Sequence, residues 1–374
     1  MNIKDFSIER YFAKYEFTAK YLLSSSDCDG FPMQYVLDLA SDEERKSWET
    51  LKLGYTETRG SLPLRKAITQ HYQHITVDNV VVSSPGEANF ALMNVLLEKG
   101  DEVICMSPMY QSLYQVAISI GCKLVFWKAE NQNKQWYFDP SLLESLVTAK
   151  TKLIITNFPH NPTGYSPSVE DWDAIIGIAR KHGIALFSDE MYRFLIHDPG
   201  NDTRSACDLY ENAISLWGTA KTFGLAGLRL GWLTSRNTEI LSKVEAFKDY
   251  LSICNNAPSE VLATIALNNQ AKFVESNIQK ISKNLELFKS FCTRNAHFLE
   301  LPMPNSGSTA FVELKIKETA MDFAEKLVQE TGIMILPSET FDFGSKHTRI
   351  GFGRETFAEI LGILEQYINR LEAI

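Results

Sequence analysis

Residues 151–190 read TKLIITNFPHNPTGYSPSVEDWDAIIGIARKHGIALFSDE. An apolar run, TKLIITN, is followed by an amphipathic run, VEDWDAIIGIARKHG, and then by a second apolar run, IALFSDE. This spacing predicts a strand, a helix that ends at Gly183, and a second strand. Two strands joined by a helix of this length lie parallel in one sheet.

The same alternation extends along the chain from about residue 78 to residue 235. Strand-like runs NVVVSS, DEVICM, KLVFWKA, NAISLWG and RLGWLT alternate with helix-like runs such as EANFALMNVLLEKG and QSLYQVAISIG. Gly100 and Gly121 also stand where helices should end. The pattern predicts an α/β fold, with a mostly parallel sheet sandwiched by helices and ligands at the carboxyl ends of its strands.

A long helical stretch from Thr238 to about Arg294 leads into a smaller α+β domain, in which the runs TAFVELKI, IMILPS and TRIGFG stand between helices. We predict an N-terminal segment, residues 1–45, that packs on this small domain. The large domain spans residues 46–265 and the small domain residues 266–374. No Pro-, Gly- or Ser-rich linker separates them, so we expect the domains to be closely packed.

Composition excludes several classes of function. With 45% hydrophobic and 22% charged residues the chain is an ordinary globular protein, and a net charge of −9 argues against nucleic-acid or anionic-membrane partners. The six scattered cysteines form no CxxC pair, which is typical of free thiols in a reducing compartment. The chain carries neither a signal region nor a long apolar run, and it lacks an HExxH motif. We therefore expect a cytoplasmic protein without a metal.

The stretch GTAKTFGLAGLRLG, residues 218–231, places two cations, Lys221 and Arg229, among small and apolar residues without an acidic partner. Burying an unpaired charge is costly, so both cations need a ligand or a partner from elsewhere. Candidates stand at the predicted strand ends: Gly86 opens a helix, Tyr110 follows a strand, and Asp189 ends one.

Each candidate also has an ordinary interpretation. A Pro-Gly turn before a helix is common, a strand-end Asp can cap the next element, and a Tyr can belong to the core. His160, in the turn NFPHNPTG, is better explained as a hydrogen-bonded structural residue than as a catalyst. Together, however, an anion site, a carboxylate, an aromatic ring and a lysine fit a phosphorylated ligand with a protonated ring nitrogen. Pyridoxal phosphate is such a ligand.

The motifs YTETRGSLPLRKAI, PHNPTG, SDEMY, GTAKTFGLAGLRLG and TRIGFG, in this order from about Tyr55, resemble those of the class I/II aminotransferases, which are fold-type I pyridoxal-phosphate enzymes. The resemblance implies that Lys221 forms a Schiff base with pyridoxal phosphate and moves the proton at the substrate Cα. It implies that Asp189 pairs with the ring nitrogen, while Asn161 and Tyr192 hydrogen-bond the ring hydroxyl oxygen.

The resemblance extends to the other predicted site residues. Tyr110 would stack on the ring, and Arg229 would hold the phosphate together with the helix start at Gly86 and Glu87. Two further roles concern the partner subunit and the substrate. Tyr55 would reach the phosphate of a neighbouring subunit, which implies a homodimer, and Arg349 would clamp the carboxylate of an amino acid or 2-oxo acid.

The sequence departs from the family pattern in three places. Gly218 stands where many members have a phosphate-binding Ser, and it is open whether Thr219 substitutes. Glu87 is an unusual neighbour for a phosphate. The segment LLSSSDCDGFP, with Ser24–Asp27, replaces a Gly-x-Pro loop and suggests a substrate with a cationic or hydroxylated side chain.

We expect an aminotransferase that moves an amino group between an α-amino acid and a 2-oxo acid. A pyridoxal-phosphate-dependent lyase or cyclase on a modified amino acid is the alternative, because all three begin by removing the proton from Cα. We do not expect a cofactor-binding sensor, because the sequence has no room for a DNA-binding domain before its first motif. We do not expect a dead site, since Lys221, Asp189, Arg229 and Arg349 are all present.

Overall fold

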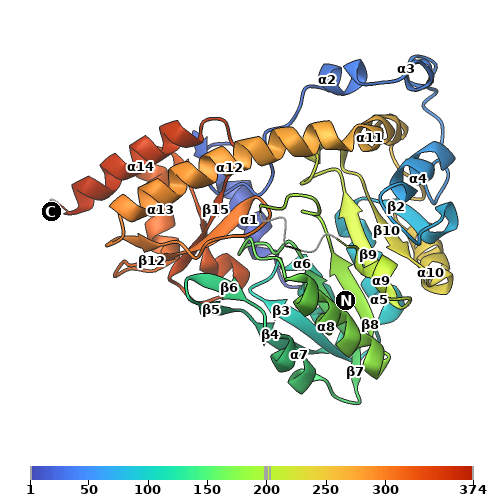
Figure 1. The fold of residues 1–374 in the computed structure, drawn as a ribbon, viewed down its shortest axis with the longest axis horizontal. Coiled ribbons are helices and arrows are strands. Elements are labelled where there is room, and N and C mark those ends of the chain that lie inside the picture. The colour runs from blue at the N-terminus through green and yellow to red at the C-terminus, as the bar shows by residue number, and fades with distance from the viewer. Residues whose placement is uncertain (1, 198–200, 202–203, 373–374) are drawn as a thin grey trace.

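The computed structural model describes residues 2–197, 201 and 204–372. The middle of the chain forms a large α/β part, and the C-terminal residues form a smaller part beside it (Figure 1). The large part holds a seven-stranded sheet in the order β2 (Val80–Ser83), β10 (Gly231–Ser235), β9 (Ala213–Gly218), β8 (Ala185–Asp189), β7 (Thr151–Asn157), β3 (Glu102–Ser107) and β4 (Lys123–Lys128). Among these strands β10 alone runs in the opposite direction to the other six. The predicted mostly parallel sheet is therefore confirmed.

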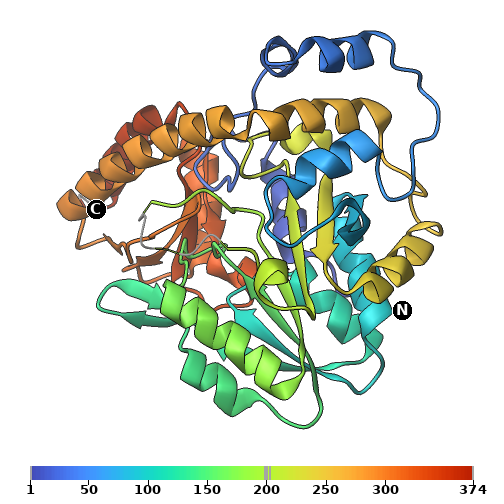
Figure 2. The same cartoon turned by 45° about the vertical axis from the view of Figure 1, so that its right-hand side comes forward.

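The connections of this sheet run in two opposite directions. Helices α5 (Pro85–Leu96) and α6 (Ser112–Ile120) lead toward β4, whereas α7 (Pro140–Leu146) and α8 (Val169–His182) lead back from β4 to β7 and then to β8. Because such crossovers are right-handed, the two pairs of helices cover opposite faces of the sheet (Figure 2). The direction changes between β3 and β7, and ligands of such sheets bind beyond the carboxyl ends of the strands at this point.

Local sequence determines where these helices begin and end. The Ser168 side chain accepts a hydrogen bond from the backbone N–H of Asp171 and caps α8. Gly121 and Gly183 end α6 and α8 in the left-handed conformation, as the sequence predicts. Gly100 also has a positive φ, but α5 ends several residues before it. Gly100 therefore serves the turn into β3, and its prediction as a helix end is wrong.

The smaller part holds a four-stranded antiparallel sheet in the order β11 (Leu299–Glu300), β12 (Thr309–Leu314), β15 (His347–Gly351) and β14 (Leu336–Pro337). It also contains α13 (Ala320–Thr331) and α14 (Phe357–Glu372). The long helix α12 (Gln270–Arg294) runs from the large part to this sheet (Figure 1). The other elements are α4 (Leu62–Thr69), η1 (Val77–Asn79), β5 (Glu130–Gln132), β6 (Gln135–Tyr137), α9 (Ala206–Leu209), η2 (Ala226–Leu228) and α10 (Thr238–Lys248).

The N-terminal residues join the two parts. Helix α1 (Ser7–Tyr15) contacts η3 (Ser338–Phe341), and β1 (Tyr21–Leu22) pairs in parallel with β13 (Ile333–Met334), so this stretch lies on the small part. Helices α2 (Met33–Asp38) and α3 (Asp42–Glu49) contact α11 (Ala257–Asn268) instead. The proposed boundaries, residues 1–45, 46–265 and 266–374, stay a prediction.

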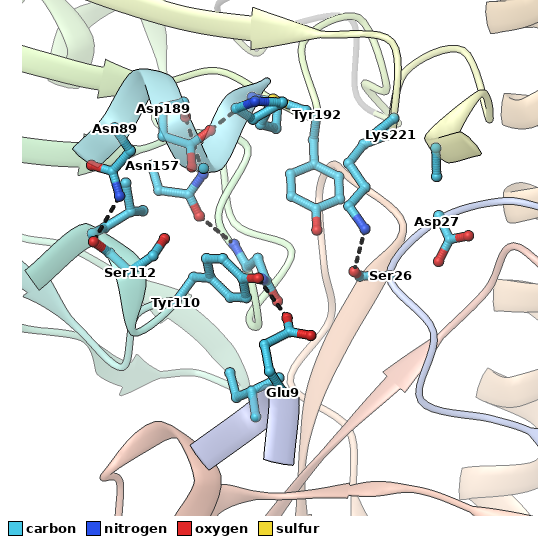
Figure 3. Close-up of a pocket in the computed structure, with 18 of the residues that line it drawn as sticks. Glu9, Ser26, Asp27, Asn89, Tyr110, Ser112, Asn157, Asp189, Tyr192 and Lys221 are labelled. Carbon is cyan, nitrogen blue, oxygen red and sulfur yellow. Dashed lines mark hydrogen bonds between the residues drawn. The ribbon is translucent and has the colours of Figure 1, made fainter. Parts of the chain in front are cut away.

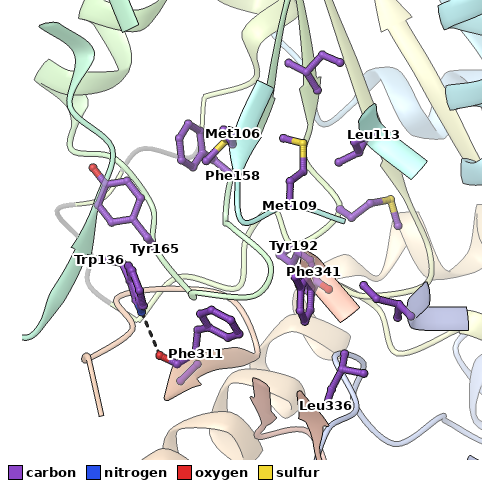
Figure 4. Close-up of a cluster of buried hydrophobic side chains, with 14 of the residues drawn as sticks. Met106, Met109, Leu113, Trp136, Phe158, Tyr165, Tyr192, Phe311, Leu336 and Phe341 are labelled. Atoms are coloured by element: carbon purple, nitrogen blue, oxygen red, sulfur yellow. Dashed lines mark hydrogen bonds between the residues drawn. The ribbon is translucent and has the colours of Figure 1, made fainter. Parts of the chain in front are cut away.

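One apolar core runs through both parts. At the junction, Trp136 on β6 donates its indole N–H to the backbone oxygen of Phe311 on β12 (3.1 Å), and the two rings lie 5.9 Å apart (Figure 4). Figure 4 shows Met106 and Phe158 of the large part in the same cluster as Phe341 of the small part. The parts are therefore closely packed, as the absence of a linker predicts.

Gly351 lies where β15 meets the N-terminal segment. Its N–H donates to the backbone oxygen of Leu23 (2.8 Å), and a Cβ at this position would lie 1.7 Å from the backbone oxygen of Ser25. We therefore expect Gly351→Ala to push the segment off β15 and to lower the free energy of unfolding by about 1–3 kcal/mol in urea denaturation. The control Gly362→Ala, on α14 where a Cβ meets nothing, should raise it by about 0.5–1 kcal/mol. Equal stability of the two variants would contradict the described packing.

Candidate active site

A cavity of about 410 Å³ lies beyond the carboxyl ends of the central strands (Figure 3). Tyr110 enters it after β3, Asn157 at the end of β7, Asp189 at the end of β8 and Lys221 after β9. The small part adds Arg349 from β15, and the N-terminal segment adds residues 25–27. The sheet edge thus brings together residues that are far apart in the sequence, as its topology predicts.

Lys221 is held by a neutral neighbour. Its Nζ donates a hydrogen bond to the hydroxyl of Ser26 (3.0 Å), and it forms no ion pair within the described part of the chain. Asp27 lies on the same side of the cavity (Figure 3). Burial alone would raise the pKa of Asp27, but the charges of Lys221 and Arg354 outweigh burial and lower it. The amine therefore faces the cavity without a bound counter-ion.

Asp189 ends β8 in the protein interior. Its Oδ1 accepts a hydrogen bond from the backbone N–H of Met191 (3.1 Å), and its backbone oxygen accepts one from Asn157 Nδ2 (3.0 Å). Burial raises the pKa of Asp189 to about 7, against the opposing effects of the Met191 hydrogen bond and of Lys221. A positive group that reached this carboxyl from the cavity would favour its ionised form.

Arg349 is fully buried and its guanidinium is held in a fixed position. Nε and Nη2 donate to the backbone oxygen of Ser24 (3.0 and 2.8 Å), and Nη1 donates to Asn161 Oδ1 (3.0 Å). Asn161 is in turn fixed by its own N–H, which donates to Asn157 Oδ1 (2.9 Å). Arg349 lines the cavity, and no carboxylate of the described residues forms an ion pair with it. The charge of Arg349 is therefore open to an acidic ligand.

Two tyrosines complete the wall. The Tyr110 hydroxyl donates to a carboxylate oxygen of Glu9 (2.7 Å), and burial together with Glu9 raises the pKa of Tyr110. The Tyr192 ring lies between Asp189 and Lys221, with its hydroxyl turned into the cavity (Figure 3). Both tyrosines thus line the cavity, and their contacts with a ligand stay a prediction.

One end of the cavity suits an anion. Helix α5 begins at Pro85 and Gly86, its N-cap Ser84 makes no side-chain capping bond, and the first backbone N–H groups of a helix lack intrahelical partners. A Cβ on Gly86 would meet nothing within 4 Å, which leaves room for a ligand. Arg229 lines the same cavity from a left-handed backbone conformation (φ 50°). Arg229 is exposed and its Nη1 donates to the backbone oxygen of Ala226 (3.3 Å). A helix N-terminus and a guanidinium that line one cavity together suit a phosphate.

His160 is a structural residue, as its sequence context suggests. Its Nε2 lies 2.9 Å from the backbone oxygen of Pro108 and its Nδ1 lies 2.7 Å from Thr163 Oγ1, so both ring nitrogens are occupied. Burial lowers the pKa of His160 to about 3. The neutral ring therefore fixes the turn that carries Asn161.

Two predicted site residues lie outside the cavity. The Glu87 carboxylate accepts hydrogen bonds from Ser83 Oγ (2.9 Å) and the backbone N–H of Ser252 (3.1 Å), which turn it away from the cavity. Tyr55 is 90% exposed and does not line the cavity of its own chain. Within this chain, neither side chain contributes to the site.

The structure explains why Gly218 stands in place of a larger residue. A Cβ there would lie 2.9 Å from both Gly231 Cα and the backbone oxygen of Leu230, where β9 and β10 pair closely. The neighbouring Thr219 is buried, and its hydroxyl donates to the same Leu230 oxygen (3.0 Å). Thr219 thus has a structural partner and does not line the cavity.

Sequence reasoning missed several cavity residues. Helix α1 and the residue after it contribute Glu9, Phe12 and Glu16, and the start of α6 and the body of α5 contribute Ser112 and Asn89. The spacing of three and four between Glu9, Phe12 and Glu16 marks one face of a helix and was a usable signal. Nothing in the sequence indicated which surface that face covers.

The comparisons with known proteins agree with this geometry. The family model for aminotransferase class I and II matches residues 18–361. The chain belongs to this family. As a member it is a pyridoxal-phosphate-dependent aminotransferase, which confirms the function, the cofactor and the fold type that the motifs predict.

Three relatives illustrate the range of the family. Aromatic-amino-acid aminotransferase 2 of Thermococcus litoralis is 25% identical over 86% of this chain and 83% of its own length. Capreomycidine synthase of Streptomyces vinaceus is 26% identical over 73% of this chain and 70% of its own. The crystal structure of a PLP-dependent aminotransferase from Streptococcus suis superposes with a TM-score of 0.92 at 26% identity and covers 99% of both chains.

The cavity of this aminotransferase fits pyridoxal phosphate. A lysine without an ion pair, a buried carboxyl with a pKa of about 7 and the open N-terminus of α5 match its aldehyde, ring nitrogen and phosphate in chemistry. The Asn89 Oδ1 is buried in this cavity without a hydrogen-bond partner in the described part of the chain. Within the described ranges no cluster of His, Cys, Asp or Glu is arranged for a metal, and no helix is long and apolar enough to cross a membrane.

The pKa of Asp189 predicts a pH dependence for the cofactor-free enzyme. Folding raises the pKa of this carboxyl to about 7, so the folded state binds more protons than the unfolded chain between pH 4 and pH 7. Its contribution to stability is therefore lost as the pH rises through that window. We expect Asp189→Asn to gain stability over the wild type, on the order of a few kcal/mol, between pH 4.5 and pH 7.5 in urea denaturation. Parallel pH profiles for the two proteins would show that Asp189 ionises freely.

Proposed function

We propose that Lys221 is the catalytic base of this aminotransferase and that the groups around it hold the cofactor and one amino acid. The observation that supports the proposal is that Lys221 and Asp189 line the same cavity yet bond to different partners, Ser26 and Met191. Each polar group is thus available to a ligand between them.

When bound, pyridoxal phosphate supplies an aldehyde that exchanges with the amino group and a ring that delocalises the electron pair left at Cα. Asp189 binds the ring nitrogen and keeps it protonated, because a buried carboxylate is stabilised by an adjacent cation. Lys221 Nζ takes the proton from the substrate Cα and moves it within the cavity. The Ser26 hydroxyl, 3.0 Å from Nζ, orients the amine for this transfer.

The remaining groups fix the orientation of both ligands. The backbone N–H groups at Gly86 and the Arg229 guanidinium hold the phosphate. Asn161 and Tyr192 bind the ring hydroxyl oxygen, and Tyr110 packs on the ring face. For Glu87 we retain a role of the backbone N–H alone, because its carboxylate is bonded elsewhere.

Arg349 binds the substrate carboxylate. Its guanidinium is held in place on one side by Ser24 and Asn161, and the charge is uncompensated by any described carboxylate within ion-pair distance. An acid that enters the cavity therefore meets a preorganised cation and orients its Cα toward Lys221.

Replacing Lys221 tests the central role. We expect Lys221→Ala to lose about 10²–10⁴-fold in turnover of an amino acid with 2-oxoglutarate or pyruvate, because proton transfer at Cα loses its base. The absorbance of bound cofactor, recorded before and after adding the amino acid, measures the first half of the reaction. Lys243→Ala, an exposed lysine paired with Glu239 on α10, is the control and should leave both readouts unchanged. Full activity of Lys221→Ala would remove the proposal.

A lyase or cyclase is the second candidate function. Two observations support it: the similarity to capreomycidine synthase and the unusual segment Ser24–Asp27. The two reactions differ in the fate of nitrogen. An aminotransferase needs a 2-oxo acid to turn over repeatedly, whereas an eliminating lyase releases ammonia without one. Ammonia release in stoichiometric excess over enzyme, without any acceptor, would favour the second candidate.

We further propose a cytoplasmic homodimer. Several large apolar side chains are exposed on two segments of the large part, namely Leu53, Tyr55, Tyr250, Leu251 and Ile253. Burial of such side chains in an interface is favourable, and Tyr55 could then reach the cofactor phosphate of the partner subunit. All six cysteines are free, which agrees with a reducing compartment.

Mixing two weakly active variants tests the shared site. Tyr55→Ala removes the group given to the partner, and Lys221→Ala removes the base, so a mixed dimer of the two has one intact site. We expect each variant alone to show weak activity, and a subunit-exchanged mixture to regain roughly a quarter of the wild-type activity, from random pairing. A mixture no more active than its components would argue against a site that uses both subunits.

A further inference from the structure

Two carboxylates of the N-terminal helix have no role in binding the cofactor. Glu9 and Phe12 on α1 and Glu16 directly after it all line the cavity. Their spacing of three and four places them on one face of the helix, so they form a continuous wall with an aromatic ring between two acids. Figure 3 shows Glu9 directed toward the middle of the cavity beside Tyr110.

Neither carboxylate has a cationic partner. Glu9 accepts a hydrogen bond from the neutral Tyr110 hydroxyl, and Glu16 has no hydrogen bond or ion pair in the described part of the chain. The nearby Arg354 is shared between Asp27 and Asp29, at 3.4 Å from each. Burial, followed by the charges of Asp27 and Glu9, raises the pKa of Glu16. Arg354 and Lys221 partly oppose this effect, but neither forms an ion pair with Glu9 or Glu16 within the described residues. The two carboxylates are therefore open to a cation carried by a ligand.

A second observation points to a ligand at this wall. Ser25 lines the same cavity, is only 3% exposed, and its hydroxyl has no hydrogen-bond partner among the described residues. A buried hydroxyl without a partner is unfavourable, and a polar ligand group would satisfy it. Ser25 adjoins Ser26, which bonds Lys221, so this unsatisfied hydroxyl belongs to the substrate side of the cavity.

The charges of the cavity define what the ligand must carry. Arg349 takes a carboxylate, and the amino group to be transferred reacts beside Lys221. A positive charge on the side chain then complements the carboxylates of Glu9 and Glu16. An aliphatic chain can pack on Phe12 while its cationic end reaches the two carboxylates, and the ring face also attracts a cation.

We propose that the amino donor is a basic α-amino acid whose side chain ends in an ammonium or guanidinium group, and that Glu9 and Glu16 bind that group. The inference rests on the proposed function and adds its substrate class. Glu9 and Glu16 are specificity residues in this scheme, because they touch the side chain and not the reacting atoms.

Matched pairs of amino acids test the proposal on the holoenzyme. L-citrulline has a neutral terminal group where L-arginine has a charged one. L-norleucine lacks the charged terminal group of L-lysine. The rate of loss of the cofactor absorbance is measured for each without any 2-oxo acid. We expect the charged member of at least one pair to react about 10-fold or more faster at equal, subsaturating concentration. L-glutamate should react more slowly than either charged donor.

Substitutions at the wall separate specificity from catalysis. Glu16→Gln and Glu9→Gln keep the size of the side chain, and the amide of Glu9→Gln still offers Tyr110 an acceptor. We expect each to lower kcat/KM for the charged donor about 10-fold and to leave the neutral donor unchanged. Asp5→Asn, an exposed acid just before α1 that does not line the cavity, is the matched control and should change neither value.

The outcomes distinguish the substrate class from the proposed roles of Lys221 and Asp189. If neutral or acidic donors react and the charged members gain no advantage, the substrate class is wrong while the aminotransferase assignment of the site stands. An unchanged charged-to-neutral ratio in both Gln variants also overturns the inference. If the amino acids tested all leave the cofactor absorbance unchanged, the proposed roles of Lys221 and Asp189 fail, and the substrate class fails with them.

Discussion

The buried carboxyl of Asp189 is the constraint on which the rest of the site depends. It ends a strand inside the protein, where a single backbone N–H donates to it and burial holds its pKa near 7. Ladder pairing sets Asp189 opposite Asn157 on β7, so its position cannot adjust to a ligand. The groups around the cavity must therefore deliver a positive charge to a fixed point, and the order of the strands determines which residues stand near it.

Two separate supports carry the side chains of the cavity. Asn157 and Asp189 stand at strand ends of one hydrogen-bonded sheet, while Ser26 belongs to a segment that lies flat on β15 of the small part. Arg349 connects the two supports, since it bonds Ser24 on one side and Asn161 on the other. The geometry of acid binding thus depends on the large and small parts remaining packed together through their common core.

Much of this arrangement could be predicted from the sequence, for a physical reason. Asp189 ends a strand with a clear apolar run, and Tyr110 and Asn161 stand a few residues beyond two such strands. Parallel strands bring their carboxyl ends to one edge. The role of Arg349 required the family resemblance, because β15 belongs to a different sheet. The carboxylate of Glu87 lies outside the cavity because adjacent residues of a helix point in different directions, and this carboxylate accepts a hydrogen bond from Ser83.

Other residues were beyond prediction because they depend on packing between distant segments. Glu9 meets Tyr110 across about a hundred residues of chain, and no local pattern tells which surface the face of α1 covers. Gly218 is explained by the backbone of the adjacent strand, which leaves no space for a Cβ. Tyr55 lies exposed on its own subunit. Its contacts in the proposed dimer therefore depend on the partner subunit.

The origin of the side chains in the cavity also has an evolutionary consequence. The groups proposed to hold the cofactor come mainly from the central sheet, whereas those proposed to face the substrate side chain come from the first thirty residues. Mutations in α1 can therefore change which molecule is accepted while leaving Lys221, Ser26 and Asp189 in place. Diversification of a lineage with this architecture can proceed by drift in a short terminal stretch, without passing through inactive ancestors.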